Sequence, residues 1–113
     1  MASLNGALSF KQAPSLSHAT NKTANLGSAR QLALEGRKHG IRANSVPPGL
    51  IVSGATRDQL EDDSFGRQMR DRTRLGRLGQ PEDVANAGAF LVSDKSLLRD
   101  RVDLVVGGGM KVW

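Results

Sequence analysis

Residues 41–53, Ile-Arg-Ala-Asn-Ser-Val-Pro-Pro-Gly-Leu-Ile-Val-Ser, decide the fold of this chain. Side chains of alternating character over 41–46 predict a short strand, which breaks at Pro47-Pro48-Gly49. Proline fixes φ and removes a backbone donor, so the chain leaves the sheet there, and glycine lets the backbone approach a bound molecule closely. A strand, a Pro-Gly turn and a loop in this order are typical of a ligand site in an open α/β sheet. We therefore expect residues 41–49 to form a strand and turn at the edge of a binding site.

A helix is predicted before this strand, over residues 18–39. Four apolar side chains recur at helical spacing and would form its buried stripe: Leu26, Ala29, Leu32 and Ala33. Ser17 is placed to cap the first turn, because serine oxygens accept hydrogen bonds from the free N–H groups there. Gly36 and Gly40, with cationic side chains between them, are the usual signals for the end of a helix.

Residues 50–78 are the least regular part of the sequence, with many charges and few apolar anchors. Short helices are predicted over 56–62 and 65–72. A loop of this composition is mobile or is ordered only by a ligand.

A well-signalled helix is predicted over 80–94. Pro81 suits its first turn, and the acidic residues that follow favour the positive end of the helix. Its buried face is expected to consist of Val84, Ala87, Gly88 and Leu91. Residues 102–106 then alternate in character and predict the last strand.

The order helix, strand, charged loop, helix, strand predicts an α/β fold, because strands separated by crossover helices run parallel. At 113 residues the chain is at most one domain. Two strands cannot fully cover the apolar faces that they and the helices carry. Part of these faces is therefore expected to drive self-association.

The composition excludes several classes of function. Cysteine is absent, which excludes disulfides, thiolate metal sites and cysteine nucleophiles, and which fits a reducing, cytoplasmic location. No apolar run approaches the ~18 residues of a membrane span, and the N-terminus lacks the pattern of a secretory signal. No cluster of His, Asp and Glu has metal-ligand spacing, so neither a membrane nor a metal is expected.

The net charge is +5, from 16 Lys and Arg against 11 Asp and Glu, which is compatible with a nucleic-acid partner. The arginines between residues 67 and 77 are interleaved with Asp71, however, and the chain has no Tyr and one Trp, so it offers no evident surface for stacking on bases. A solvated charged surface is the better interpretation, and no nucleic-acid partner is expected.

Four blocks stand in an order and at a spacing that identify a family. They are Ala29-Arg-Gln-Leu-Ala-Leu-Glu-Gly36, Asn44-Ser-Val-Pro-Pro-Gly-Leu-Ile-Val-Ser53, Leu75-Gly-Arg-Leu-Gly-Gln-Pro-Glu-Asp-Val84 with Phe90-Leu-Val-Ser-Asp94, and Val102-Asp-Leu-Val-Val-Gly-Gly-Gly109. In the same order they resemble the end of the active-site helix, the Asn-Ser-Val-x-Pro-Gly-x-Ile-x-Thr segment, the Gly-Arg-x-Gly-x-Pro-Glu-Glu/Asp helix and the last strand of the short-chain dehydrogenase/reductase family. The resemblance is to the C-terminal half of that family.

This resemblance implies a partial Rossmann-like fold, the C-terminal portion of a doubly wound parallel sheet with flanking helices. It implies NAD(P)-dependent interconversion of an alcohol and a carbonyl compound, with a small molecule as the substrate and residues 50–78 as the lid over it. It also implies assembly, either as a homo-oligomer or by pairing with a relative from the same family.

The family's Gly-rich element, which holds a pyrophosphate at a helix N-terminus, has no match in this sequence. Gly107-Gly108-Gly109 lies near the C-terminus with no predicted helix after it. NAD or NADP is the cofactor that the resemblance implies, but we expect this chain alone to bind either dinucleotide poorly. The residues that discriminate NAD from NADP are not among the matched blocks.

The resemblance also assigns candidate catalytic residues. Lys22 falls on the family's lysine, which lowers the pKa of the catalytic tyrosine and bonds to the nicotinamide ribose, and His18 falls on that tyrosine, the proton donor. The two positions are four apart and share one helix face. Imidazole is a competent general acid or base near neutral pH, but it is shorter than phenol, and a surface histidine at a helix start is the alternative interpretation. Ser3, or less well Ser9, is the candidate for the serine that orients the substrate carbonyl, and both also fit a purely structural role.

Four residues of the Pro-Gly segment match the family's nicotinamide-side contacts: Pro48, Gly49, Ile51 and Ser53. In the family the backbone of the Ile position meets the carboxamide, and the hydroxyl at the Ser/Thr position meets a phosphate. The alternative interpretation is a strand terminus followed by a plain turn.

The sequence therefore predicts a fragment of an oxidoreductase that has no activity alone, because the Gly-rich half is missing and the tyrosine is replaced. The alternative is a non-catalytic interaction or dimerisation module built on residues 18–38. One further departure from the family is local: Arg99-Asp100-Arg101 stands where the family usually has Thr-Gly before the last strand.

Overall fold

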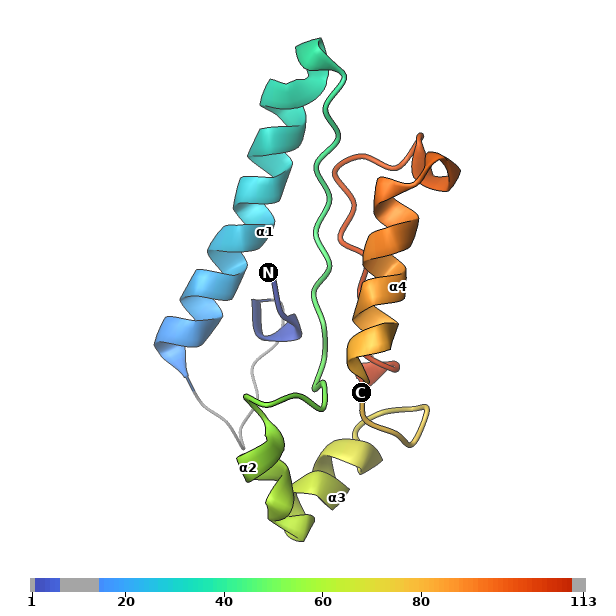
Figure 1. Cartoon of the computed structure of the whole chain (residues 1–113). Helices are drawn as coiled ribbons and strands as arrows, with labels where there is room; N and C mark the ends of the chain where they lie inside the picture. The colour runs from blue at the N-terminus through green and yellow to red at the C-terminus, as the bar shows by residue number, and fades with distance from the viewer. Residues whose placement is uncertain (1, 7–14, 111–113) are drawn as a thin grey trace.

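The computed structural model describes residues 2–6 and 15–110 (Figure 1). Within them the helices are α1 Leu16–Gly36, α2 Arg57–Glu61, α3 Asp63–Asp71 and α4 Pro81–Val92, with 3-10 turns at Leu4–Gly6, Arg37–His39 and Asp94–Ser96. Figure 1 shows α1 and α4 on either side of a long extended segment, with α2 and α3 together at one end of the molecule. This segment, residues 41–52, is the centre of the architecture.

Helix α1 begins earlier than the sequence suggested, at Leu16. Ser15 caps it, with its Oγ accepting a hydrogen bond from the His18 N–H at 3.3 Å, so the expectation that Ser17 is the cap was wrong. The helix continues into a 3-10 turn and ends at Gly40, whose φ of 66° is the left-handed conformation that glycine adopts most easily.

The buried stripe of α1 is narrower than expected. Leu26 and Ala33 are buried, whereas Leu32 is 57% exposed. Leu32 stands one position before Ala33, and one position turns the helix by more than a quarter of a revolution. Leu32 therefore lies to one side of the face that contacts the rest of the chain.

The two segments predicted as strands pair in parallel, as expected, but they do not form regular strands. Parallel bridges join Ser45 to Asp103 and Pro48 to Val106. The Ser45 N–H donates to the Val102 carbonyl at 2.9 Å, and the Leu104 N–H donates to the Ser45 carbonyl at 2.9 Å.

The expectation of continuous strands over 41–46 and 102–106 was wrong, and proline is one physical reason. Pro47 has no N–H group, so this pairing lacks a backbone donor between those of Ser45 and Gly49. The described residues are accordingly mostly helical, with isolated bridges in place of a sheet.

Two more contacts complete the pairing around the central segment. The Leu4 N–H donates to the Pro48 carbonyl at 2.9 Å, which ties the N-terminal residues to it. Ile51 forms a parallel bridge with Gly79, which lies just before α4. The central segment thus collects the N-terminal residues, the segment before α4 and the C-terminal residues.

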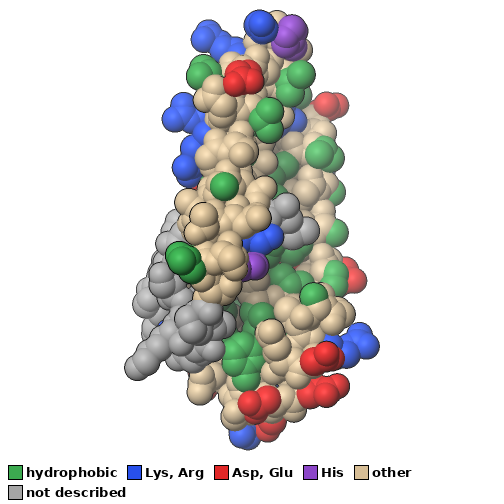
Figure 2. Space-filling model, turned by 90° about the vertical axis from the view of Figure 1, so that its left-hand side faces the viewer, with side chains coloured by type: hydrophobic (Ala, Val, Ile, Leu, Met, Phe, Trp, Pro, Cys, Tyr) green, Lys and Arg blue, Asp and Glu red, His purple; other side chains and the backbone are tan. Residues whose placement is uncertain are grey.

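The core is small. The buried apolar residues are Ala2, Leu4, Leu26, Ala33, Met69, Leu78, Leu91 and Met110. Within the described residues, these eight stand against nine exposed large apolar side chains: Leu16, Leu32, Leu34, Ile41, Leu75, Phe90, Val92, Leu97 and Leu98. Figure 2 shows apolar side chains at several separate places on one face of the molecule. Much apolar surface therefore stays in contact with water, as the sequence suggested.

The segment between the central segment and α4 is ordered by local caps. Asp62 caps α3, with its carboxylate accepting from the Ser64 N–H at 2.9 Å and the Ser64 hydroxyl at 2.6 Å, and these bonds lower the pKa of Asp62. Met69 is the buried anchor of α3. Helix α4 starts with a capping box, in which the Gln80 N–H donates to Asp83 at 2.8 Å.

Candidate functional site

One cavity of about 510 Å³ brings together seven of the residues that the sequence singled out. They are Ser3, His18, Lys22, Pro48, Gly49, Ile51 and Ser53. They come from three parts of the chain: the N-terminal residues, the first turns of α1 and the segment after the prolines. Ser9, the weaker candidate serine, lies outside the described residues.

The start of α1 places His18 and Lys22 on this cavity. The Ser15 cap fixes the first turn, and the two side chains follow each other by four positions. Gly6 lets the N-terminal residues lie directly against this turn, because a Cβ at Gly6 would stand 2.8 Å from the Lys22 carbonyl carbon. The Thr23 hydroxyl donates to the Gly6 carbonyl at 2.9 Å and holds the two segments together.

Ser3 is held at the cavity by its neighbour. Leu4 is 1% exposed, and its N–H bonds to the Pro48 carbonyl. Glycine makes room for the Leu4 side chain, since a Cβ at Gly107 would lie 2.5 Å from Leu4 Cδ1. A serine close to the chain terminus is thereby given a fixed position that the sequence alone did not predict.

Sequence reasoning missed a residue of the turn after Gly49. The Thr56 hydroxyl lines the cavity, donates to the Ile51 carbonyl at 2.7 Å and accepts from the Ser53 N–H at 3.0 Å. A threonine three positions after a serine at a helix start is a signal for this kind of turn.

Helices α2 and α3 contribute further lining residues to the cavity. Gln59 comes from α2, and Phe65 and Met69 come from α3. The spacing of Phe65 and Met69 by four positions is the signal that could have identified them as one face. Among the described lining residues, His18 and Lys22 are the ionisable ones, and the remaining wall is apolar or carries hydroxyl and amide groups.

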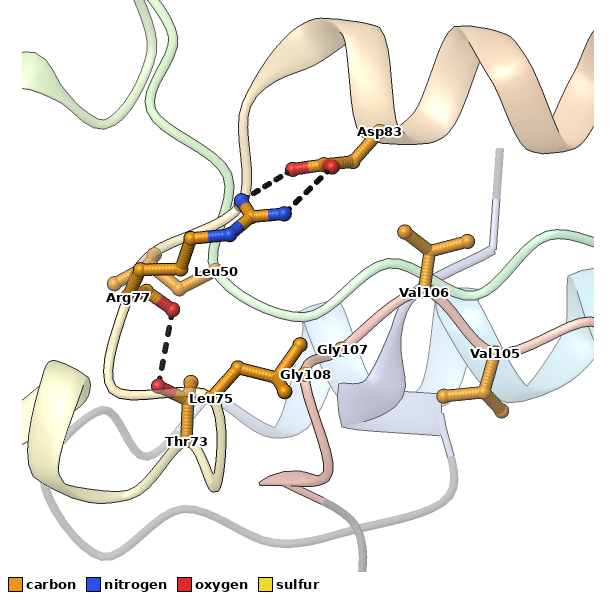
Figure 3. A pocket seen from close by; sticks show the side chains of 10 residues that line it. Leu50, Thr73, Leu75, Arg77, Asp83, Val105, Val106, Gly107 and Gly108 are labelled. Carbon is orange, nitrogen blue, oxygen red and sulfur yellow. Dashed lines mark hydrogen bonds and ion pairs between the residues drawn. The ribbon is translucent and has the colours of Figure 1, made fainter.

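A second cavity, of about 220 Å³, lies between the end of the lid segment and the last residues of the chain (Figure 3). Arg77 forms a bidentate ion pair with Asp83 there, at 2.7 and 2.8 Å, and this pair lowers the pKa of Asp83 strongly. The Thr73 hydroxyl donates to the Arg77 carbonyl at 3.0 Å. This cavity is lined by none of the predicted site residues, and its polar contacts join the lid segment to α4.

Residues 2–6 and 15–110 contain no group of three or more His, Cys, Asp or Glu side chains arranged to hold a metal ion. Nor does any helix of the described part have the length and apolar character needed to cross a membrane.

Comparison with known proteins identifies relatives along nearly the whole chain. A family model described as enoyl-(acyl carrier protein) reductase matches residues 1–111. An L-rhamnose 1-dehydrogenase (NAD(P)(+)) of Sphingomonas sp. is 48% identical over 66% of this chain and 30% of its own length. A tropinone reductase homolog of Arabidopsis thaliana is 38% identical over 99% of this chain and 36% of its own length. Dehydrogenase/reductase SDR family member 4 of Homo sapiens is 37% identical over 88% of this chain and 36% of its own length.

Comparison with solved structures also identifies dehydrogenases that resemble this chain along nearly its whole length. The crystal structure of gox2181 superposes with a TM-score of 0.95 and 32% identity over 100% of this chain and 44% of its own. A 4-hydroxyisoleucine dehydrogenase complexed with NADH gives a TM-score of 0.92 and 25% identity over 99% of this chain and 45% of its own. A gluconate 5-dehydrogenase of Burkholderia cenocepacia, in complex with NADP and tartrate, gives a TM-score of 0.92 and 26% identity over 99% of this chain and 43% of its own.

The chain spans about a third of the length of the curated relatives it matches, 30% to 36% of the three named above. Its fold is that of the corresponding part of Rossmann-type enzymes, with bridges in place of regular strands. The family match over residues 1–111 and the 38% identity along 99% of the sequence show that the chain belongs to the short-chain dehydrogenase/reductase family.

Proposed function

We propose that this chain forms the nicotinamide- and substrate-facing part of an NAD(P)-dependent oxidoreductase that interconverts an alcohol and a carbonyl compound. The observation that carries the proposal is the 510 Å³ cavity, on which three separate segments place the residues matched to the family's catalytic and nicotinamide-side positions. A cavity of this size is in the range that holds a small molecule.

The donors around the cavity fit the nicotinamide end of the cofactor. Lys22 offers an ammonium group for the ribose hydroxyls, Ser53 offers a hydroxyl for a phosphate, and Ile51 offers backbone groups for the carboxamide. Pro48 and Gly49 form part of the wall between them, and the missing side chain of Gly49 lets Gly107 and Leu4 pack against it, since a Cβ there would lie 3.0 Å from the Gly107 Cα. When bound, the nicotinamide would supply or accept the hydride.

Three side chains are proposed to handle the substrate. Ser3 orients the carbonyl oxygen through its hydroxyl, and His18 holds or accepts the proton of the alcohol oxygen, as imidazole does near neutral pH. Lys22 is placed one turn further along the same helix face. Because imidazole is shorter than phenol, turnover is expected to be slow even in a completed site.

The adenosine and pyrophosphate part of the cofactor is expected to add little to binding by this chain. The glycines near the C-terminus serve close packing, since a Cβ at Gly109 would lie 2.9 Å from Arg74, and the Gly108 carbonyl accepts from the Leu75 N–H at 3.3 Å.

The test is a comparison of two ligands by calorimetry and NMR on the 113-residue chain. Reduced nicotinamide mononucleotide and NADH are expected to bind with similar, weak affinity and to shift the amide signals of Ile51 and Ser53. A dissociation constant for NADH in the low micromolar range, about −8 kcal/mol, would contradict the expected weakness. Signals that shift around Arg77, or none that shift, would refute the proposed site.

A second candidate function is a non-catalytic interaction or dimerisation module, and the exposed apolar residues of α1 and of the turn after it favour it. Leu32, Leu34 and Ile41 are 57%, 64% and 57% exposed, and they line a shallow groove together with the cationic residues that follow α1. Sedimentation at several concentrations tests this candidate. A homo-oligomer, or a mixed complex with a full-length relative, supports it, and a concentration-independent monomer that also fails to bind the relative refutes it.

A further inference from the structure

The turn from Ile51 to Thr56 is closed by a single side chain. The Thr56 Oγ1 lies 2.7 Å from the Ile51 carbonyl oxygen, 3.0 Å from the Ser53 amide nitrogen and 3.3 Å from the Ser53 Oγ. Two of the residues proposed to meet the nicotinamide end of the cofactor therefore share one hydroxyl as their partner.

A hydroxyl has one proton and two lone pairs, and this decides which contacts of the Thr56 Oγ1 are donated and which are accepted. The shortest contact takes the proton, so Thr56 donates to the Ile51 carbonyl and accepts from the Ser53 N–H. The remaining lone pair faces the Ser53 hydroxyl, which can donate to it. Without a ligand, the Ser53 hydroxyl can therefore donate to the Thr56 Oγ1, and a ligand oxygen could take the place of that acceptor.

The bridge to Gly79 explains why Ile51 needs this partner. The two hydrogen bonds of that bridge belong to its neighbours: the Val52 N–H donates to the Gly79 carbonyl at 2.8 Å, and the Gly79 N–H donates to the Leu50 carbonyl at 3.0 Å. In parallel pairing the groups of Ile51 itself then face the other way. Its carbonyl is taken by Thr56, and its N–H makes no hydrogen bond within the described residues.

Thr56 also connects this turn to α2. Its N–H donates to the Ser53 carbonyl at 3.1 Å, and its carbonyl accepts from the Leu60 N–H of α2 at 3.1 Å. The backbone that carries Ile51 and Ser53 is therefore bonded to the first turn of α2 through Thr56.

We propose that Thr56 is a positioning residue for nicotinamide binding, an inference that rests on the proposed function. It holds the Ile51 carbonyl and the Ser53 amide, and it thereby presents the Ile51 N–H and the Ser53 hydroxyl to the ligand in a fixed arrangement. Fixed donors bind better than mobile ones because their ordering does not have to occur on binding.

The experiment titrates the 113-residue chain with reduced nicotinamide mononucleotide and records amide NMR spectra. Thr56→Val removes the hydroxyl and keeps the shape, whereas Thr56→Ser keeps the hydroxyl. Thr20→Val makes the same chemical change on the exposed surface of α1 and is the matched control. Thr56→Ala is a second variant without the hydroxyl, for the case that Thr56→Val does not fold.

We expect Thr56→Val to weaken binding about tenfold and to speed hydrogen exchange at the Ser53 amide about tenfold, the size of one lost hydrogen bond. Thr56→Ser and Thr20→Val should stay within about threefold of the parent chain on the same scale. Tenfold weaker binding in a folded Thr56→Val or Thr56→Ala chain, with rescue by Thr56→Ser, supports the inference.

Two results overturn the inference in different ways. If the parent chain shows no saturable shift, the proposed nicotinamide site fails and the inference fails with it. If the parent chain binds and the folded hydroxyl-free variants bind within about threefold of it, the inference alone is wrong. Loss of the dispersed spectrum in both hydroxyl-free variants would make Thr56 a folding residue, which also refutes positioning.

Discussion

The two ends of the central segment are held by different kinds of contact. Upstream of the prolines, polar side chains supplement the backbone bonds around Ser45. Their bonds join Arg42 to the carbonyls of Leu91 and Arg99, Asn44 to the carbonyl of Arg99 and the N–H of Val102, and Asp100 to the N–H groups of Ala43 and Arg101. Downstream, the segment is held by the buried Leu4 and by the Thr56 turn.

This difference shows how the segment can be stable at one end and available at the other. Upstream, the side chains take up backbone donors and acceptors, so few groups are left for a ligand. Downstream, Leu4 supplies burial and the Thr56 hydroxyl supplies closure, and in the proposed site this leaves the Ile51 N–H and the Ser53 hydroxyl for the ligand. Apolar burial carries more free energy than exposed polar contacts, so the downstream end should respond more strongly to mutation.

Leu4→Ala is expected to give the largest effect. Leu4 is 1% exposed, and its removal leaves a cavity between Ser3, Pro48 and Gly107, which should lower the free energy of unfolding by about 2–4 kcal/mol. Urea denaturation measures it. Leu98→Ala, at a side chain that is 100% exposed, is the control and should change stability by less than about 0.5 kcal/mol. Equal effects at the two leucines would contradict the assignment of the core.

Asp103→Ala should give an intermediate effect at the upstream end. Its carboxylate accepts from the Ser45 hydroxyl at 2.5 Å, and Ser45 is 7% exposed, so a buried hydroxyl loses its partner at a cost of about 1–3 kcal/mol. The ion pair of the same carboxylate with Arg30, at 2.6 Å, is half exposed, and Arg30→Ala should cost less than about 1 kcal/mol. A larger loss for Arg30→Ala would place the stabilisation in the ion pair.

Arg101→Gly is expected to stabilise the upstream end. Arg101 has a φ of 58° and is the one described residue other than glycine in the left-handed region. Removing the side chain relieves about 1 kcal/mol of backbone strain. Thermal unfolding is the measurement, with Arg99→Gly as the control that should destabilise instead. A lower melting temperature for Arg101→Gly would mean that its side-chain contacts outweigh the strain.

The smallest effect is expected at the Arg77–Asp83 pair, away from both ends. Arg77 lowers the pKa of Asp83 in the folded chain, so the pair contributes stability above the ordinary carboxyl pKa of about 3.9 and loses it as the pH falls toward the folded-state value. Asp83→Asn should therefore reduce the dependence of the unfolding midpoint on pH below about 4. An unchanged acid limb in this variant would show that the exposed pair contributes nothing to stability.

Local signals in the sequence predicted several features that the structure contains. The periodicity around Leu26 and Ala33 indicated α1, and Pro81 with the acidic residues after it indicated the start of α4. The match of Pro48 to Ser53 with a family motif singled out a segment that lines the larger of the two cavities described above. These signals act within a few residues, so propensity and capping are enough to read them.

Some features could not be predicted, because they depend on contacts between distant parts of the chain. The exposure of Leu32 and the isolated bridges in place of strands follow from how segments meet, so tertiary contacts override a local preference there. The Ser15 cap and the closure by Thr56 are different, because they are contacts between residues three to five positions apart that the sequence analysis missed.

By itself, the sequence determined the positions of the main helices, the break at Pro47-Pro48-Gly49, the family and the residues worth examining as a site. Only the tertiary structure decided that Ser3, His18, Lys22 and the Pro-Gly turn line one cavity. The physical reason is that the cavity exists through a few long-range contacts, above all the bond from Leu4 to Pro48 and the space left by Gly107. Such contacts form only when backbone segments approach closely, and no local pattern specifies that approach.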